Sequence, residues 1–139
     1  MRSKVIRSLG GKQPTLEQAV HMAGRRLAAA HVDEETAASV SLAILEALGN
    51  IARHACRPSE SLKFDLLLDI GHDLITVDVA DYGPGFELHN YAMPDIFAES
   101  GRGIPLMRQL CDSLEYRRGP ARNHLILRKR YAPGIRKAS

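Results

Sequence analysis

The sequence lacks the features that mark disulfide-rich and membrane-spanning proteins. Its 139 residues contain only two cysteines, Cys56 and Cys111, which lack a metal-binding spacing and cannot build a disulfide framework. No run of about 18 apolar residues is present, so we expect no membrane-spanning helix. The basic N-terminus has no long apolar core behind it, so we expect no signal peptide. A reduced, cytoplasmic location is the simplest interpretation.

Acidic residues are absent from the last part of the chain. Residues 116–139 carry eight arginines and lysines and no aspartate or glutamate, whereas the net charge of the whole chain is only +3. A basic end can meet nucleic acid or an acidic protein surface. No aromatic interleaving or nucleic-acid-binding motif accompanies it, so direct nucleic-acid binding is the weaker alternative. A solvated basic tail at 131–139 explains part of the charge more simply.

The rest of the composition is that of one globular domain. Hydrophobic residues make up 45% and charged residues 25% of the chain, both ordinary values. The length is sufficient for one hydrophobic core. We therefore expect a single domain over residues 1–139, with its core at about 5–130.

Hydrophobic periodicity predicts alternating groups of strands and helices. Thr15 with Gln18 fits a capping box, and Asp33 is a suitable N-cap for a second helix. The order predicts an α/β fold, an α+β two-layer sandwich in which helices cover one face of a mixed β-sheet. The predicted elements are strands at 4–9, 62–70, 74–80, 114–118 and 123–130, helices at 15–30, 33–56 and 104–112, and a lid-like loop at 86–100.

A polar stripe interrupts the second predicted helix. Glu46, Asn50 and His54 recur every four residues within an Ala- and Leu-rich segment, and this spacing keeps their side chains on one side of a helix. The stripe is either a solvated face or a functional one. Gly49 beside it costs about 1 kcal/mol relative to alanine, which favours close approach of another group to the helix backbone.

Two glycine motifs follow. Asp81-x-Gly83-x-Gly85 comes at the end of a predicted strand, where glycine lets the backbone turn sharply and approach a flat ligand. Gly101-x-Gly103 precedes a predicted helix, and a helix N-terminus offers free N–H groups to anions. Each motif alone is also typical of an ordinary turn.

Together, in this order and spacing, the polar stripe and the two glycine motifs resemble those of the Bergerat-fold (GHKL) ATPases. The resemblance covers roughly residues 5–130. The short chain, without a phosphoacceptor-histidine or sensor domain, looks most like the bacterial anti-sigma-factor serine kinases. The implied fold is a Bergerat ATP-binding fold with an ATP lid, and the implied cofactors are ATP and Mg²⁺.

The resemblance also implies roles for individual residues. Glu46 matches the general base, and Asn50 matches the asparagine whose oxygen binds Mg²⁺. Asp81 matches the aspartate that accepts a hydrogen bond from the adenine amino group, and His54 is expected to be structural. The other implied nucleotide-binding residues are Gly83, Gly85, Gly101, Arg102, Gly103 and Asn123.

Three features depart from the family pattern, one of which is a lid that is short on obvious phosphate ligands, although backbone amides could serve instead. Pro105 stands where many relatives have a small residue, although proline is tolerated in the first turn of a helix. Near the adenine pocket the family usually shows Gly-Thr-Thr, whereas this chain has Arg122-Asn123-His124. Asn123 would have to supply the hydrogen bond of the missing threonine, which leaves nucleotide affinity and ADP/ATP preference open.

By resemblance, the protein is an ATP- and Mg²⁺-dependent protein-serine/threonine kinase of a partner-switching module. It would phosphorylate a STAS-domain antagonist and sequester a sigma factor or another output protein. Relatives are commonly homodimers, and the partner surface is expected to include Arg25, Arg26 and the lid. The alternatives are a non-catalytic ATP-binding sequestering regulator, a free-standing ATPase and a basic nucleic-acid-binding protein.

Overall fold

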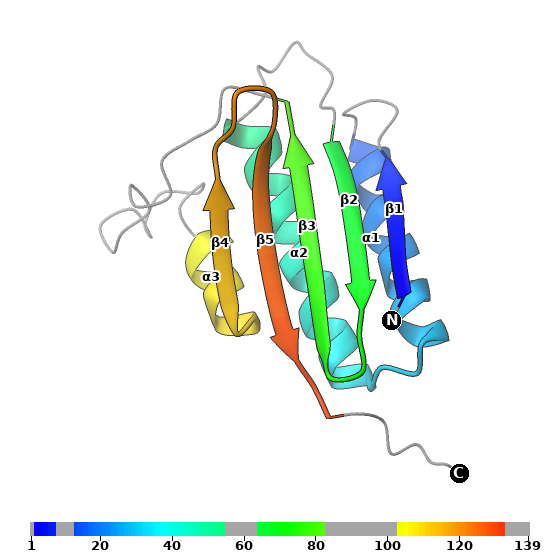
Figure 1. Ribbon diagram of the computed structural model, residues 1–139. Coiled ribbons are helices and arrows are strands. Elements are labelled where there is room, and N and C mark those ends of the chain that lie inside the picture. The colour runs from blue at the N-terminus through cyan, green and yellow to red at the C-terminus, as the bar shows by residue number, and fades with distance from the viewer. Residues whose placement is uncertain (1, 8–12, 55–63, 83–102, 133–139) are drawn as a thin grey trace.

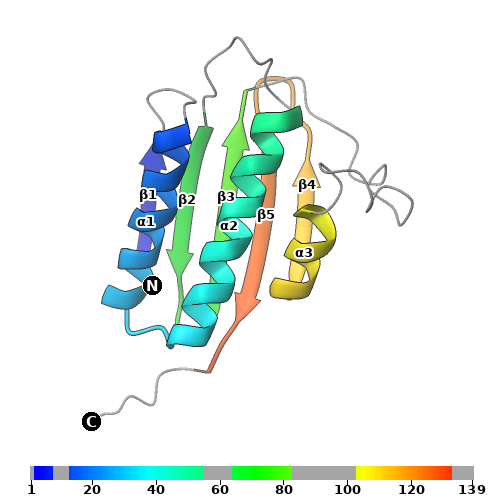
Figure 2. The ribbon, with the colours of Figure 1, turned by 180° about the vertical axis from the view of Figure 1, so that it is seen from behind.

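The computed structural model of the chain describes residues 2–7, 13–54, 64–82 and 103–132. Its five strands form one sheet in the order β1-β2-β3-β5-β4, and its three helices all cover the same face (Figures 1 and 2). The expected two-layer α/β fold is therefore confirmed. In chain order the elements are β1 (Arg2–Arg7), α1 (Gln13–Ala29), α2 (Glu34–His54), β2 (Phe64–Ile70), β3 (Leu74–Asp81), α3 (Gly103–Leu110), β4 (Ser113–Arg117) and β5 (Asn123–Arg130).

The sheet is antiparallel at each of its four described pairings, which corrects the expected mixed sheet. The short connections between β2 and β3 and between β4 and β5 force antiparallel pairing. The connection through α3 does return β4 in the direction of β3, but β5 lies between these two strands (Figure 1). Strands β3 and β4 therefore run in the same direction but are not hydrogen-bonded to each other.

The turn between α1 and α2 has complete capping at both helix ends. At the end of α1, the N–H of Val32 donates to the carbonyl of Leu27 (3.1 Å) and the N–H of His31 donates to that of Ala28 (3.0 Å), the pattern of a Schellman motif. His31 adopts the left-handed φ of 64° that this motif needs. At the start of α2, the N–H of Thr36 donates to Oδ2 of Asp33 (2.9 Å), which confirms the predicted N-cap.

This cap leads to the first prediction. Hydrogen bonds from the side chain and the backbone of Thr36 lower the pKa of Asp33, so its contribution to stability is present above the unfolded-state pKa of about 3.9 and is lost as the pH falls through the lower folded-state value. At pH near 7, Asp33→Ala should lower the free energy of unfolding by about 0.5–2 kcal/mol. Urea unfolding of wild type and variant at neutral and acid pH measures this difference. Asp33→Asn is the control, because asparagine also caps a helix but does not titrate. An equal loss at both pH values would contradict the role of the carboxylate.

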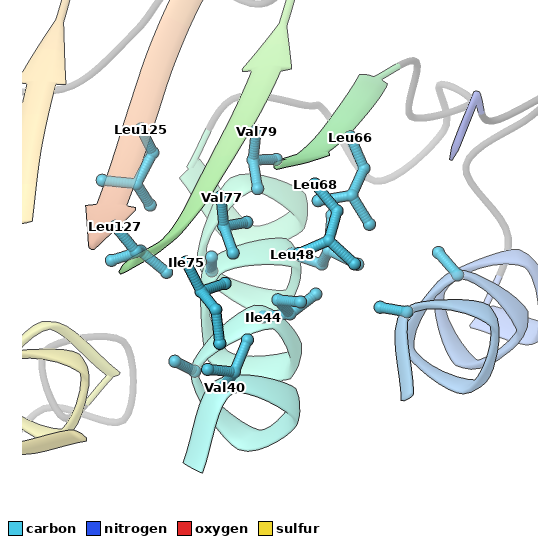
Figure 3. Packing of buried hydrophobic residues seen from close by; sticks show 14 of the residues in the cluster. Val40, Ile44, Leu48, Leu66, Leu68, Ile75, Val77, Val79, Leu125 and Leu127 are labelled. Carbon is cyan, nitrogen blue, oxygen red and sulfur yellow. The ribbon is translucent and has the colours of Figure 1, made fainter. Parts of the chain in front are cut away.

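The hydrophobic core lies between the sheet and the helices. Val40, Ile44 and Leu48 of α2 point toward the sheet (Figure 3). Their spacing of four residues makes the continuous apolar stripe that a sheet-covering helix requires. The sheet residues that face them are Leu66, Leu68, Ile75, Val77, Val79, Leu125 and Leu127.

The first described strand and the residues that follow the last one differ slightly from the expectations. The first strand begins at Arg2, earlier than the predicted 4–9, and pairs with β2 along its whole length. Tyr131, assigned to the basic tail, instead donates its backbone N–H to the carbonyl of Asp73 (3.1 Å) and its hydroxyl to the carbonyl of Gly71. The folded domain therefore includes Tyr131, and residues 133–139 lie outside the described ones. Among the described helices, none is long and apolar enough to cross a membrane.

Candidate nucleotide-binding site

Helix α2 carries the first two predicted site residues one helical turn apart. Glu46 is partly exposed, whereas Asn50 is completely buried. Neither Oδ1 nor Nδ2 of Asn50 has a hydrogen-bond partner among the described residues. A buried polar group without a partner costs roughly 1–3 kcal/mol, and each such group in a native structure calls for an explanation. Asn50 is therefore a strong candidate for a ligand-binding residue.

A buried carboxylate and a buried amide meet at the ends of two neighbouring strands. Asp81, the last residue of β3, and Asn123, the first residue of β5, are cross-strand partners. The amide Nδ2 of Asn123 donates to Oδ1 of Asp81 at 3.1 Å, and the two residues are 3% and 0% exposed, respectively. We call Asp81 and Asn123 the buried pair. The hydrogen bond fixes the orientation of a carboxylate that could otherwise not be buried at low cost.

The buried pair lies on the helix-covered side of the sheet. Asp81 alternates with Val79 and Val77, which face α2, and it is the cross-strand partner of the buried Phe64. The C-terminal turns of α2, the end of β3 and the start of β5 lie at the same end of the molecule (Figure 2). The structure thus brings Asn50 and the buried pair to the same end of the molecule, and Glu46 lies one helical turn before Asn50 on α2.

The glycine motifs are described only in part. Gly83, Gly85, Gly101 and Arg102 lie outside the described residues, as does the predicted loop at 86–100. Gly103 is the first residue of α3, which agrees with the predicted helix start after the second glycine motif. Pro105 lies in the first turn of this helix, a position where its missing N–H costs nothing. His54 is the last residue of α2, and the description does not extend to its side chain.

The amide oxygen of Asn50 could supply one ligand to a metal ion that is shared with a bound phosphate. In the described part of the chain, no group of three or more His, Cys, Asp or Glu side chains could hold a metal ion by itself. Mg²⁺ prefers oxygen ligands and is usually bound by one or two protein groups together with phosphate oxygens and water. Oδ1 of Asn50, which no described residue contacts by a hydrogen bond, is an oxygen of the required kind.

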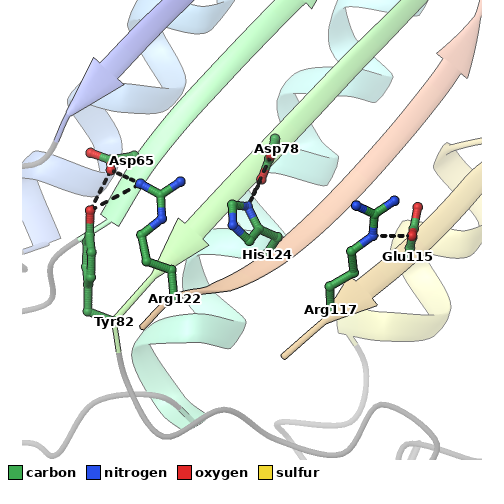
Figure 4. Close-up of polar contacts among 7 residues, drawn as sticks. All are labelled: Asp65, Asp78, Tyr82, Glu115, Arg117, Arg122 and His124. Carbon is green, nitrogen blue, oxygen red and sulfur yellow. Dashed lines mark hydrogen bonds and ion pairs between the residues drawn. The ribbon is translucent and has the colours of Figure 1, made fainter. Parts of the chain in front are cut away.

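A polar cluster that the sequence did not indicate lies directly behind the buried pair. Tyr82 donates its hydroxyl to Oδ2 of Asp65 (2.6 Å), and Nη1 of Arg122 donates to the same oxygen (3.0 Å). The guanidinium also lies 5.8 Å from the centre of the Tyr82 ring. We call Asp65, Tyr82 and Arg122 the open-face clamp, because they lie on the face of the sheet that no described helix covers (Figure 4). Nη1 of Arg122 also donates to the hydroxyl oxygen of Tyr82 at 3.5 Å, and this hydrogen bond raises the pKa of Arg122, so the guanidinium stays charged.

Other charged residues of the open face form pairs. Asp78 and Nδ1 of His124 are 2.9 Å apart, and Glu115 pairs with Arg117 and Arg128 (Figure 4 shows the first two pairs). Glu115 has a lowered pKa, chiefly because of the hydrogen bond from Arg117. Strand alternation predicts that these side chains share a face, but the sequence does not show which of them pair.

Comparison with known proteins identifies the class. Residues 12–129 match the histidine kinase-like ATPase domain family, so the chain belongs to this family of ATP-binding domains. The expected resemblance to Bergerat-fold (GHKL) ATPases is thereby confirmed. The chain is 30% identical over 101 residues to the serine/threonine-protein kinase BtrW of Bordetella bronchiseptica, an alignment that covers 68% of this chain and 71% of BtrW.

Solved structures agree on the fold. A chain in the crystal structure of the SiaB-SiaC complex from Pseudomonas aeruginosa matches with a TM-score of 0.57 and 13% identity, over 91% of this chain and 89% of that one. The histidine kinase domain of the Erythrobacter litoralis EL346 blue-light-activated histidine kinase matches with a TM-score of 0.53 and 18% identity. The match covers 84% of this chain but only 59% of that kinase chain.

Proposed function

We propose that this protein is an ATP- and Mg²⁺-dependent protein-serine/threonine kinase that regulates a partner protein. The observation that carries the proposal is the buried amide of Asn50, one helical turn from the partly exposed carboxylate of Glu46 and without a hydrogen-bond partner among residues 2–7, 13–54, 64–82 and 103–132. An amide oxygen that can share a metal ion with phosphates and a carboxylate that can accept a proton are two of the groups that proteins supply to phosphoryl transfer.

Each site residue has a distinct part in this proposal. Glu46 accepts the proton of a serine hydroxyl as that oxygen bonds to the γ-phosphorus and the bond to the ADP oxygen breaks. Asn50 would hold Mg²⁺, which when bound offsets the negative charge of the phosphate oxygens. Asp81 accepts a hydrogen bond from the adenine amino group, and Asn123 holds its carboxylate in place. The phosphates would lie near the glycines at 101 and 103.

The proposal also names the protein partners of the kinase. The similarity to BtrW, a serine/threonine-protein kinase, supports transfer to a protein, and the fold match to a chain from a two-protein complex is consistent with a protein partner. We propose a STAS-domain protein as the phosphorylated partner and a sigma factor or another output protein as the sequestered one. We further propose cytoplasmic location and a homodimer, with the exposed Arg25 and Arg26 on the partner surface.

Transfer of label from ATP tests the proposal. The purified chain is incubated with γ-labelled ATP, Mg²⁺ and a candidate STAS-domain protein, and the phosphorylated residue is mapped. Label on a serine or threonine of the partner supports the kinase. Binding of ATP with release of free phosphate and no labelled protein would instead indicate a free-standing ATPase. Binding without any turnover would indicate a non-catalytic sequestering regulator.

A further inference from the structure

The open-face clamp connects three strands at the end of the sheet that carries the candidate site. Asp65 lies on β2, Tyr82 directly follows β3 and Arg122 directly precedes β5. Strands β2 and β5 are not neighbours, because β3 lies between them. The 3.0 Å ion pair between Arg122 and Asp65 therefore reaches across the end of β3.

A small residue leaves the space for this contact. Ala80 is the cross-strand partner of both Asp65 and His124, and strand alternation places it on the open face. Ala80 is nevertheless only 2% exposed, so the larger side chains around it cover it.

Each clamp residue is the sequence neighbour of a buried residue on the other face. Tyr82 follows Asp81, Arg122 precedes Asn123, and Asp65 follows Phe64. Because side chains alternate along a strand, the clamp and the buried pair lie back to back through the same peptide units. Holding the clamp residues together fixes where the last peptide of β3 and the first peptide of β5 lie, and with them the 3.1 Å contact of the buried pair.

Solvent exposure indicates what the clamp contributes. The side chain of Arg122 is 40% exposed and that of Asp65 is 18% exposed. Partly exposed ion pairs add little to the global free energy of unfolding. A group of binding residues, in contrast, is sensitive to small displacements. The clamp is therefore expected to act on local geometry more than on overall stability.

We propose that the open-face clamp positions the buried pair for recognition of a nucleobase that carries an exocyclic amino group. The inference rests on the proposed function, since it needs the candidate site to bind ATP. The clamp residues are positioning residues, because they act through the peptide units that they share with the buried pair and lie on the opposite face of the sheet. A displaced carboxylate would lose the hydrogen bond from the amino group but leave contacts to ribose and phosphates unchanged.

Purine riboside triphosphate separates these two kinds of contact, because it differs from ATP only in having a hydrogen atom in place of the exocyclic amino group. Equilibrium dissociation constants for both nucleotides are measured on wild type, Arg122→Met and Tyr82→Phe. Both variants should bind ATP about three- to tenfold more weakly, which corresponds to the loss of about one hydrogen bond, and their affinity for purine riboside triphosphate should be unchanged. Arg117→Met is the matched control, since it breaks an ion pair on the same face but on the edge strand β4.

Tyr82→Phe retains the aromatic ring and so keeps the test valid if Arg122→Met fails to fold. Unchanged ATP affinity in both variants would overturn the inference while leaving the proposed function standing. An equal loss for both nucleotides, with a lower melting temperature, would also overturn it and assign the clamp a purely structural role. If the wild-type chain binds neither nucleotide, the proposed function itself fails.

Discussion

Replacing Glu46 by glutamine should reduce phosphoryl transfer by about 10²–10⁴-fold, the usual contribution of a general base. Glutamine has nearly the same shape as glutamate but cannot accept the proton of the attacking hydroxyl. Affinity for ATP should stay within about twofold, because the base acts on the protein substrate and not on the nucleotide. Transfer of labelled phosphate at saturating ATP, together with ATP binding, measures both quantities.

Glu35→Gln is the matched control for this prediction. Glu35 is an exposed acidic residue on the same helix, and a separation of eleven residues places it close to the same helix face as Glu46. Its replacement removes the same charge from α2 without removing the proposed base. Retention of transfer by Glu46→Gln, or an equal loss in both variants, would exclude a catalytic role for Glu46.

Replacing Asn50 by alanine should weaken Mg²⁺-dependent ATP binding and leave the free energy of unfolding nearly unchanged. The amide is fully buried and both of its polar atoms lack a hydrogen-bond partner among the described residues, so its removal relieves a desolvation cost of roughly 1–3 kcal/mol. The cavity that the smaller residue leaves opposes this gain. The free energy of unfolding should therefore change by no more than about 1 kcal/mol in either direction, whereas the increase in ATP affinity that Mg²⁺ produces should be lost.

Leu48→Ala provides the reference for an ordinary core residue of the same helix. Leu48 is fully buried and packs against the sheet, and its truncation should cost about 2–5 kcal/mol. Denaturant unfolding of the two variants, with ATP titrations of Asn50→Ala with and without Mg²⁺, tests the contrast. A loss of stability in Asn50→Ala as large as in Leu48→Ala would show that the amide is a structural residue.

The elements of this fold could largely be predicted because their signals are local. The capping side chain of Asp33, the apolar stripe of α2 and the alternation in β3 each depend on residues close in sequence. The pairing of the strands, and whether each pair is parallel or antiparallel, could not be predicted as reliably. It depends on the insertion of β5 between β3 and β4, and this arrangement is settled by long-range packing that no single segment encodes.

The candidate site was predictable in its parts but not in its contacts. The four-residue spacing indicated Glu46 and Asn50, and the strand-end motif indicated Asp81. Periodicity did not reveal that Asn50 is buried and has no hydrogen-bond partner within the described part of the chain, because that requires knowing what packs around it. The hydrogen bond from Asn123 to Asp81 joins residues 42 positions apart. Asn123, which stands where the family usually has threonine, therefore holds the carboxylate of Asp81 by this hydrogen bond.

The contacts of the open-face clamp could not be predicted from the sequence. Asp65 belongs to no motif, and Tyr82 and Arg122 hold positions within or beside the motifs to which the sequence assigns no role. The latter two flank the buried pair in sequence, and strand alternation could have placed them on the opposite face. Tyr82 and Arg122 both donate to one carboxylate oxygen of Asp65, and this arrangement depends on three strands lying in register.

The most direct test of a nucleotide site at this end of the sheet is a calorimetric titration of ATP into the wild-type chain with Mg²⁺. We expect saturable binding of one ATP per chain, much weaker without Mg²⁺ and abolished or strongly reduced in Asp81→Ala. Absence of saturable ATP binding by the folded wild-type chain would contradict the assignment of Asn50 and the buried pair to a nucleotide.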